Sequence, residues 1–141
     1  EDTGLPFPDD HFDLVLSWSA IYYHGNRTLV SRAIDEFHRV CKPGGVLLMS
    51  VTHPNSSLAE RLSGDVGDGA HRIESESPHD NREGLKIFYD ADPTGWHALL
   101  EGFGRVEEGY VEIDLFTADR RDAWRLFRAT KQAPEHEIRD P

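Results

Sequence analysis

Aromatic, imidazole and amide side chains follow two apolar segments of this chain, residues 14–18 and residues 46–51. The candidates for chemistry at these positions are Tyr22, Tyr23, His24, His53 and Asn55. An imidazole titrates near neutral pH and can accept a proton from a hydroxyl or an amine, and a phenol can orient such a group. Tyr23, His24 and His53 are therefore predicted as catalytic residues. The alternative interpretation is an aromatic turn that packs on the rim of a sheet.

The two apolar segments flank a stretch with helical periodicity. Apolar residues recur at helical spacing between residues 29 and 41, and polar residues fill the other face. Asn26 or Thr28 can cap the start of this helix, and the Pro-Gly-Gly sequence at 43–45 ends it. Short continuous apolar runs are typical of strands buried on both faces of a parallel sheet. Strand, helix and strand thus predict a right-handed crossover unit with parallel strands.

The second half of the chain is less regular. Residues 63–84 are rich in Gly, Ser, Asp and Glu without a periodic pattern, which predicts a lid, an insertion or plain disorder, with a short strand at 86–89 closing the loop. Asp92 and Pro93 begin a second amphipathic helix, and residues 106–115 are typical of a strand. Residues 123–130 fit a helix better than a strand on periodicity alone. Residues 132–141 form a polar tail.

The composition limits the partners and the compartment. The 141 residues carry 26 acidic and 15 basic side chains, a net charge of -11, which disfavours nucleic acid and a membrane surface as partners. Four arginines, at 120, 121, 125 and 128, are expected on a solvated face that nearby acidic residues neutralise. Cys41, the single cysteine, is expected in the core and fits a cytoplasmic location. The histidines lack the spacing of zinc sites, so no metal is expected.

Two motifs in order connect the chain to a known family. Residues 5–13 have the sequence LPFPDDHFD before the first apolar run, and residues 36–45 have the sequence EFHRVCKPGG before the second. This pair of motifs, separated by one helix, resembles the class I S-adenosylmethionine (SAM)-dependent methyltransferases. The resemblance is sharp over residues 1–53 and loose over the remainder.

The resemblance implies an α/β fold, namely strands four to seven of a Rossmann-like sheet whose last strand is antiparallel. Strand four would span residues 13–18, strand five 45–52, strand six 105–115 and strand seven 123–131. It therefore replaces the helix expected from periodicity at 123–130 with a strand. Residues 1–131 would form the C-terminal part of the methyltransferase domain, with 63–84 as a flexible insertion or lid.

The resemblance also implies where SAM would bind. Ligands of open α/β sheets bind at the carboxyl ends of the strands. Ser17, Trp18 and Ser19 would line the methionyl end of SAM after strand four, with an ordinary strand terminus as the alternative. Glu1 and Asp2 would approach the adenine amine, with Leu5 packed nearby. A solvated terminus is the alternative for Glu1 and Asp2.

The glycine-rich turn and the ribose-binding acidic residue of the family have no counterpart in the 141 residues. We therefore expect a fragment that is inactive alone, whose intact parent methylates a small-molecule acceptor, with the acidic loop after strand five selecting that acceptor. The alternative is a non-catalytic α/β binding module that self-associates through the exposed edge of strand four. A nucleotide-dependent oxidoreductase is a third possibility, which the two motifs disfavour.

Overall fold

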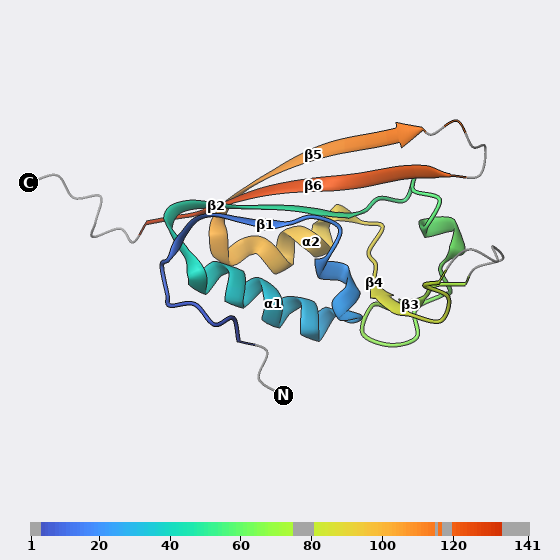
Figure 1. The fold of residues 1–141 in the computed structure, drawn as a ribbon, viewed down its shortest axis with the longest axis horizontal. Coiled ribbons are helices and arrows are strands. Elements are labelled where there is room, and N and C mark those ends of the chain that lie inside the picture. The colour runs from blue at the N-terminus through green and yellow to red at the C-terminus, as the bar shows by residue number, and fades with distance from the viewer. Residues whose placement is uncertain (1–3, 75–80, 115, 117–119, 134–141) are drawn as a thin grey trace, which may run out of the picture.

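The centre of the protein is a four-stranded mixed sheet, seen in a computed structural model that describes residues 4–74, 81–114, 116 and 120–133 (Figure 1). The strand order is β1-β2-β6-β5, where β1 is Phe12–Ser17, β2 is Cys41–Thr52, β6 is Arg121–Lys131 and β5 is Gly104–Asp114. β1 pairs with β2 in parallel, and the other two pairs are antiparallel. The predicted Rossmann-like α/β sheet is therefore confirmed, including the antiparallel last strand.

Helix α1, Arg27–Val40, makes the predicted crossover from β1 to β2. Asn26 is its N-cap, and the Oδ1 atom of Asn26 accepts a hydrogen bond of 2.9 Å from the Leu29 N–H. The helix ends at Val40, before the Pro-Gly-Gly sequence, and those three residues already belong to β2. Cys41, at the C-cap, is fully buried as expected.

Helix α2, Pro93–Leu100, lies on the same face of the sheet as α1 (Figure 1). Asp92 caps it by accepting a hydrogen bond of 2.9 Å from the Thr94 N–H, and the single 3-10 turn η3, Glu101–Phe103, continues it. Trp96 of α2 packs on Phe127 of β6, with ring centroids 6.3 Å apart. Trp96 of the predicted second helix is thus part of the core between the helices and the sheet.

The strand at β6 corrects the helix that periodicity alone predicts for residues 123–130. Ala123, Phe127 and Ala129 are buried on the helix-covered face, whereas Trp124 and Leu126 point to the other face and are half-buried. When a strand carries apolar residues on both faces, some of them fall three or four positions apart in the sequence. This is the spacing typical of an amphipathic helix, so periodicity alone predicts a helix. The strand implied by the family resemblance is correct.

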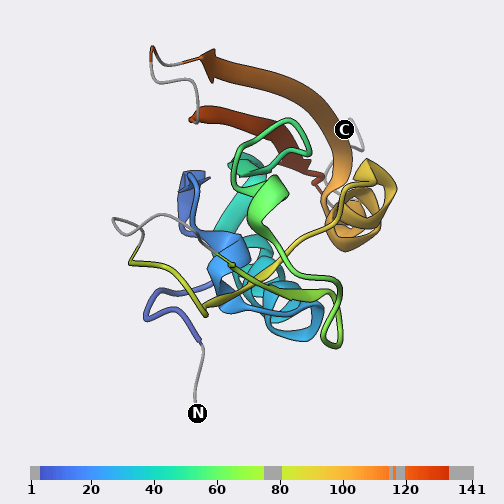
Figure 2. The ribbon, with the colours of Figure 1, turned by 90° about the vertical axis from the view of Figure 1, so that its right-hand side faces the viewer.

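A small two-stranded unit lies beyond the carboxyl end of β1 (Figures 1 and 2). Strand β3, Ala70–Arg72, pairs with strand β4, Lys86–Phe88, and β4 packs against the 3-10 turn η1, Ile21–His24. The short strand predicted at 86–89 is confirmed, and the segment between β2 and β3 contains a further 3-10 turn, η2, Ala59–Arg61. Part of the predicted insertion, residues 75–80, lies outside the described residues.

The face of the sheet opposite the two helices is open among the described residues (Figure 2). β1 is an edge strand, and its outward side chains Leu14 and Leu16 are 57% and 61% exposed. The intervening Val15 packs against the core. Parallel strands are normally covered on both faces, so this side of β1 is an apolar surface that the described part of the chain leaves in water.

Lys131, at the end of β6, connects the sheet to the C-terminus of α1. Its side chain is only 12% exposed, and its Nζ donates to the carbonyl oxygens of His38 and Cys41 at 2.8 and 2.9 Å and to Asp10 Oδ1 at 2.9 Å. The ammonium therefore satisfies carbonyl groups at the end of the helix, where a cation also interacts favourably with the helix dipole.

We expect Lys131→Met to lower the free energy of unfolding by about 1–3 kcal/mol, because the carbonyl oxygens at the end of α1 lose their donor in a water-poor environment. Urea unfolding at neutral pH measures the change. Lys42→Met is the matched control, since Lys42 is 47% exposed and 3.6 Å from Asp13, and we expect a change within about 0.5 kcal/mol. Equal effects of the two substitutions would contradict the structural role of Lys131.

Candidate active site

The carboxyl ends of β1 and β2 bring several polar side chains together. Ser17 lies opposite Met49 in the parallel register, so β2 extends past the end of β1. Ser17, Ser50 and Thr52 are at most 5% exposed, and the Ser50 Oγ accepts a hydrogen bond of 2.7 Å from the Ser19 N–H. Buried hydroxyls at the end of an apolar sheet are unusual in a purely structural core. They mark this edge as the candidate site.

The turn after β1 holds Ser19 in a conformation that serine rarely adopts. Its φ angle is 50°, in the left-handed region, where a side chain is normally disfavoured. The Ser19 Oγ is buried, and the Ser19 side chain lies within hydrogen-bonding reach of Tyr22 in the next turn. Strained backbone is found disproportionately at ligand-binding sites.

Trp18 and Trp124 form an aromatic pair next to this turn. Trp18 is 46% exposed, and its ring centroid lies 5.8 Å from that of Trp124 at an angle of 47°. Trp124 sits opposite Thr52 in the β2–β6 register, so the pair is anchored at the end of β2. Among the residues predicted to bind the cofactor, Ser17, Trp18 and Ser19 thus lie together at the carboxyl edge.

The aromatic turn η1 follows directly. Tyr22 is 4% exposed, and its ring lies 4.8 Å from that of Tyr23, which is exposed together with His24. Burial raises the pKa of Tyr22, against hydrogen bonding with the side chains of Ser19, Thr52 and Trp124. Tyr22 is therefore a buried, neutral phenol beneath η1, while Tyr23 and His24 lie on the solvent-exposed side of this turn.

His53 begins the loop after β2 and is half-buried against Tyr110 of β5, with ring centroids 4.7 Å apart. Burial and the Arg125 guanidinium lower the pKa of His53, against the opposing charge of Glu112. Tyr110 is not among the site residues predicted from the sequence. In the sequence it is only a tyrosine in an alternating strand, and it meets His53 because β5 pairs with β6 beside β2.

Leu5 lies against α1 rather than in the turn after β1. Its N–H donates to Glu36 Oε1 at 2.7 Å, and its carbonyl oxygen accepts a hydrogen bond of 3.0 Å from Arg39. Arg39 also pairs with the other Glu36 oxygen at 2.8 Å and with Asp9 at 2.9 Å. These contacts fix the path of the chain before β1. Glu1 and Asp2, predicted as the adenine-contacting residues, lie outside the described residues.

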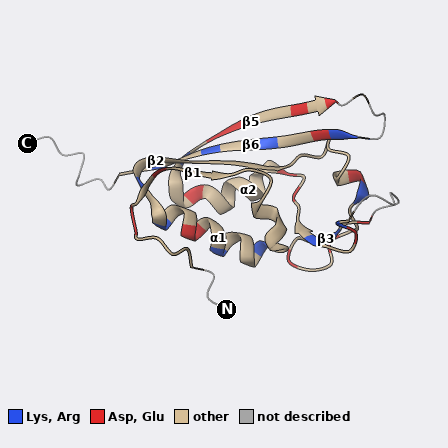
Figure 3. Ribbon diagram, in the orientation of Figure 1, with Lys and Arg blue, Asp and Glu red and all other residues tan. Residues whose placement is uncertain are grey.

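Charged residues of β5 and β6 pair with each other across the strands (Figure 3). Arg128 lies close to Glu107, Arg125 pairs with Glu108 at 3.5 Å, and Arg121 approaches Glu112 at 3.9 Å. Arg120 pairs with Asp122 at 3.5 Å. The predicted neutralisation of these arginines by acidic residues is confirmed, but a single solvated face is wrong. Arg125 is only 14% exposed and lies on the opposite face of β6 from Arg128.

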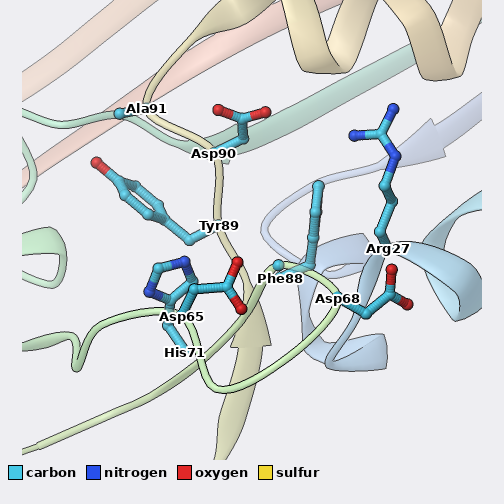
Figure 4. A pocket seen from close by; sticks show the side chains of 9 residues that line it. Arg27, Asp65, Asp68, His71, Phe88, Tyr89, Asp90 and Ala91 are labelled. Atoms are coloured by element: carbon cyan, nitrogen blue, oxygen red, sulfur yellow. The ribbon is translucent and has the colours of Figure 1, made fainter.

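A hollow of about 520 Å³ opens between the β3–β4 unit and the N-terminus of α1 (Figure 4). It is lined by Arg27 and by the carboxylates of Asp65, Asp68 and Asp90. Asp68 Oδ2 accepts hydrogen bonds from the Thr28 N–H and Oγ1 at 2.9 and 2.6 Å, so it ties this loop to α1. None of the residues predicted for the site lines this hollow.

Two further searches bear on the site. Within the described residues, no three His, Cys, Asp or Glu side chains come together in an arrangement that could hold a metal ion. The described helices are also too short or too polar to cross a membrane.

Comparisons with known proteins agree with this geometry. Residues 1–49 match a protein-family model described as a methyltransferase domain. A protein of Encephalitozoon cuniculi named as a methyltransferase is 32% identical over 117 residues, which are 79% of this chain and 54% of that protein. A ubiquinone/menaquinone biosynthesis C-methyltransferase of Marinomonas is 27% identical over 127 residues, 76% of this chain and 49% of its own.

A crystal structure of a SAM-dependent methyltransferase from Methanosarcina mazei superposes with a TM-score of 0.67 at 21% identity, covering 93% of this chain and 64% of that one. The chain is similar in sequence and in fold to these methyltransferases. It spans about half the length of the curated relatives that it matches. The segments predicted as strands four, five, six and seven form β1, β2, β5 and β6.

We expect Glu36 to stabilise the methyltransferase fold in a pH-dependent way. The Arg39 hydrogen bond, followed by the Leu5 N–H, holds the pKa of Glu36 below its usual value. A carboxylate with a lowered pKa in the folded state stabilises above its ordinary pKa, and this contribution disappears as the pH falls through the folded value. Glu36→Gln should therefore be less stable than the wild type at neutral pH, and the difference should shrink in acid.

Urea midpoints measured across the acid range test this expectation. Glu60→Gln is the control, because Glu60 is exposed in η2, and we expect its difference from the wild type to stay near zero. If the difference in urea midpoint between Glu36→Gln and the wild type did not change with pH, the Glu36–Arg39 ion pair would not be what holds the segment before β1 in place.

Proposed function

We propose that the protein takes part in SAM-dependent methyl transfer to a small-molecule acceptor, with the carboxyl edge of β1 and β2 as its contribution to the active site. The observation that carries the proposal is the turn Ser17–Trp18–Ser19. It combines a half-exposed indole, a strained backbone and a buried hydroxyl at the point where ligands of α/β sheets bind. Relatives named as methyltransferases support it.

Ser17 to Ser19 would hold the methionyl end of SAM at this edge. Glu1 and Asp2 stay the predicted contacts of the adenine, whereas Leu5 is bound to Glu36 and Arg39 of α1. SAM supplies an electrophilic methyl group on a sulfonium, and the protein's task is to align the acceptor with it and exclude water. Trp18 and Trp124 offer aromatic surface of the kind that attracts a cation.

The acceptor would lie toward the loops after β1 and β2. Tyr23 and His24 are exposed on η1, and His53 follows β2, so these predicted catalytic residues approach the edge from two sides. The net charge of -11 favours a small-molecule acceptor over nucleic acid or a membrane surface. A cytoplasmic location and selection of the acceptor by residues 63–84 stay predictions.

A second candidate is a non-catalytic interaction module. It is favoured by the exposed Leu14 and Leu16 on edge strand β1, which could pair with a second copy of the chain. Binding of SAM separates the two candidates, because an interaction module has no need for the cofactor.

We expect Trp18→Ala to weaken SAM binding roughly tenfold, because the half-exposed indole supplies apolar surface at the turn. Isothermal titration calorimetry with the full product of the gene measures this, alongside the 141-residue chain. Leu85→Ala is the matched control, since Leu85 is 49% exposed and lies in the loop before β4. Unchanged affinity in Trp18→Ala would remove this turn from the site, and no SAM binding by either protein would favour the interaction module.

A further inference from the structure

His53 begins a tight turn that determines which of its ring nitrogens carries a proton. The Ser56 N–H donates to the His53 carbonyl oxygen at 2.9 Å, which closes a four-residue turn. Pro54 occupies the second position of this turn, where its fixed φ angle is favourable. Within the turn, the backbone N–H of Asn55 lies 3.0 Å from the Nδ1 of His53.

This contact has only one chemical interpretation. A backbone N–H can donate a hydrogen bond but cannot accept one, so Nδ1 must accept with its lone pair. A neutral imidazole carries one N–H, which must then be on Nε2. His53 therefore has a hydrogen-bond donor at Nε2, and the lone pair on Nδ1 is already engaged by the backbone of Asn55.

Neighbouring side chains hold the His53 ring in place. Asn55 Nδ2 donates to the Tyr110 hydroxyl at 3.2 Å, and that hydroxyl donates to Glu112 Oε1 at 3.0 Å. The Tyr110 ring packs against the His53 ring at an angle of 62°. The charged groups that face the imidazole are Arg125 of β6 and Glu112 of β5. With burial, Arg125 lowers the His53 pKa and so favours the neutral ring.

His53 is the first residue after β2, at the carboxyl edge of the sheet. It follows Thr52, which is opposite Trp124 in the sheet, and Trp124 contacts Trp18 of the turn after β1. The His53 N–H is itself bound to the Ala123 carbonyl oxygen at 3.1 Å, so the loop is anchored on β6.

We propose that His53 binds the methyl acceptor by donating its Nε2–H to a carbonyl or carboxylate oxygen of that molecule, and does not remove a proton from it. The inference rests on the proposed function and names a chemical class of acceptor, one that carries such an oxygen. It replaces the role of proton acceptor that the sequence analysis assigns to His53.

His71 offers an internal reference for this assignment. Its Nδ1 lies 2.7 Å from the Ser63 carbonyl oxygen, which can only accept a hydrogen bond. The Nδ1 of His71 must therefore carry a proton, the opposite of His53. The two histidines should differ in one spectrum of the same sample.

Long-range ¹H–¹⁵N spectra of the histidine-labelled 141-residue chain test the proton position. We expect His53 to show a protonated Nε2 and an unprotonated Nδ1 above its pKa, and His71 to show a protonated Nδ1. The signals of His53 are assigned by their loss in His53→Gln. Asn55→Ala keeps the backbone N–H and should leave the pattern unchanged. A protonated Nδ1 in neutral His53 would overturn the proposal.

Benzoate serves as the probe for the acceptor oxygen. We expect it to shift the His53 Nε2–H resonance and to leave His71 unmoved. A glutamine amide can replace an Nε2–H donor but cannot act as a base, so His53→Gln should retain most of the affinity for benzoate. His53→Ala should lose roughly tenfold. Circular dichroism confirms that each variant is folded.

Two results would contradict the proposed contact. Equal loss of affinity in the glutamine and alanine variants would show that a donor at this position is not what binds the probe. A shift confined to His71 would place the probe in the hollow near Arg27. Both measurements are independent of SAM binding, so their failure can be told apart from failure of the proposed methyl transfer.

Discussion

The parallel pairing of β1 with β2 is the constraint on which the rest of the structure depends. A parallel pair requires a long crossover, which α1 supplies, and it places the ends of both strands at one edge. At that edge, Ser50 of β2 accepts the Ser19 N–H and holds the strained turn after β1. The same edge receives Trp124 from β6, so three strands contribute to one small site.

The sequence predicts the crossover unit well because its signals are local. Asn26 as the cap, the helical spacing after it and the two apolar runs lie within about forty residues. Periodicity fails at residues 123–130 because β6 is apolar on both faces, and only the family resemblance predicts the strand correctly. The approach of Tyr110 to His53 could not be predicted, since it depends on β5 pairing with β6 and on both following β2 in space.

The turn after β2 is one feature of the site that the sequence itself predicts. The His-Pro-Asn-Ser sequence at 53–56 has proline at the second turn position, which predicts a turn and the inward N–H of Asn55. The left-handed Ser19 has no such signal, because serine is not a residue that this conformation selects. Its strain is visible only once β2 fixes the path of the turn.

The central claim is that SAM binds at the carboxyl edge of β1 and β2, and amide hydrogen exchange with and without SAM tests it most directly. In the full product of the gene, the account predicts slower exchange over residues 17–24 and 50–55 when SAM is added, with little change in β3 and β4. Protection confined to the loop that contains Asp68, beside the hollow lined by Arg27, would contradict it.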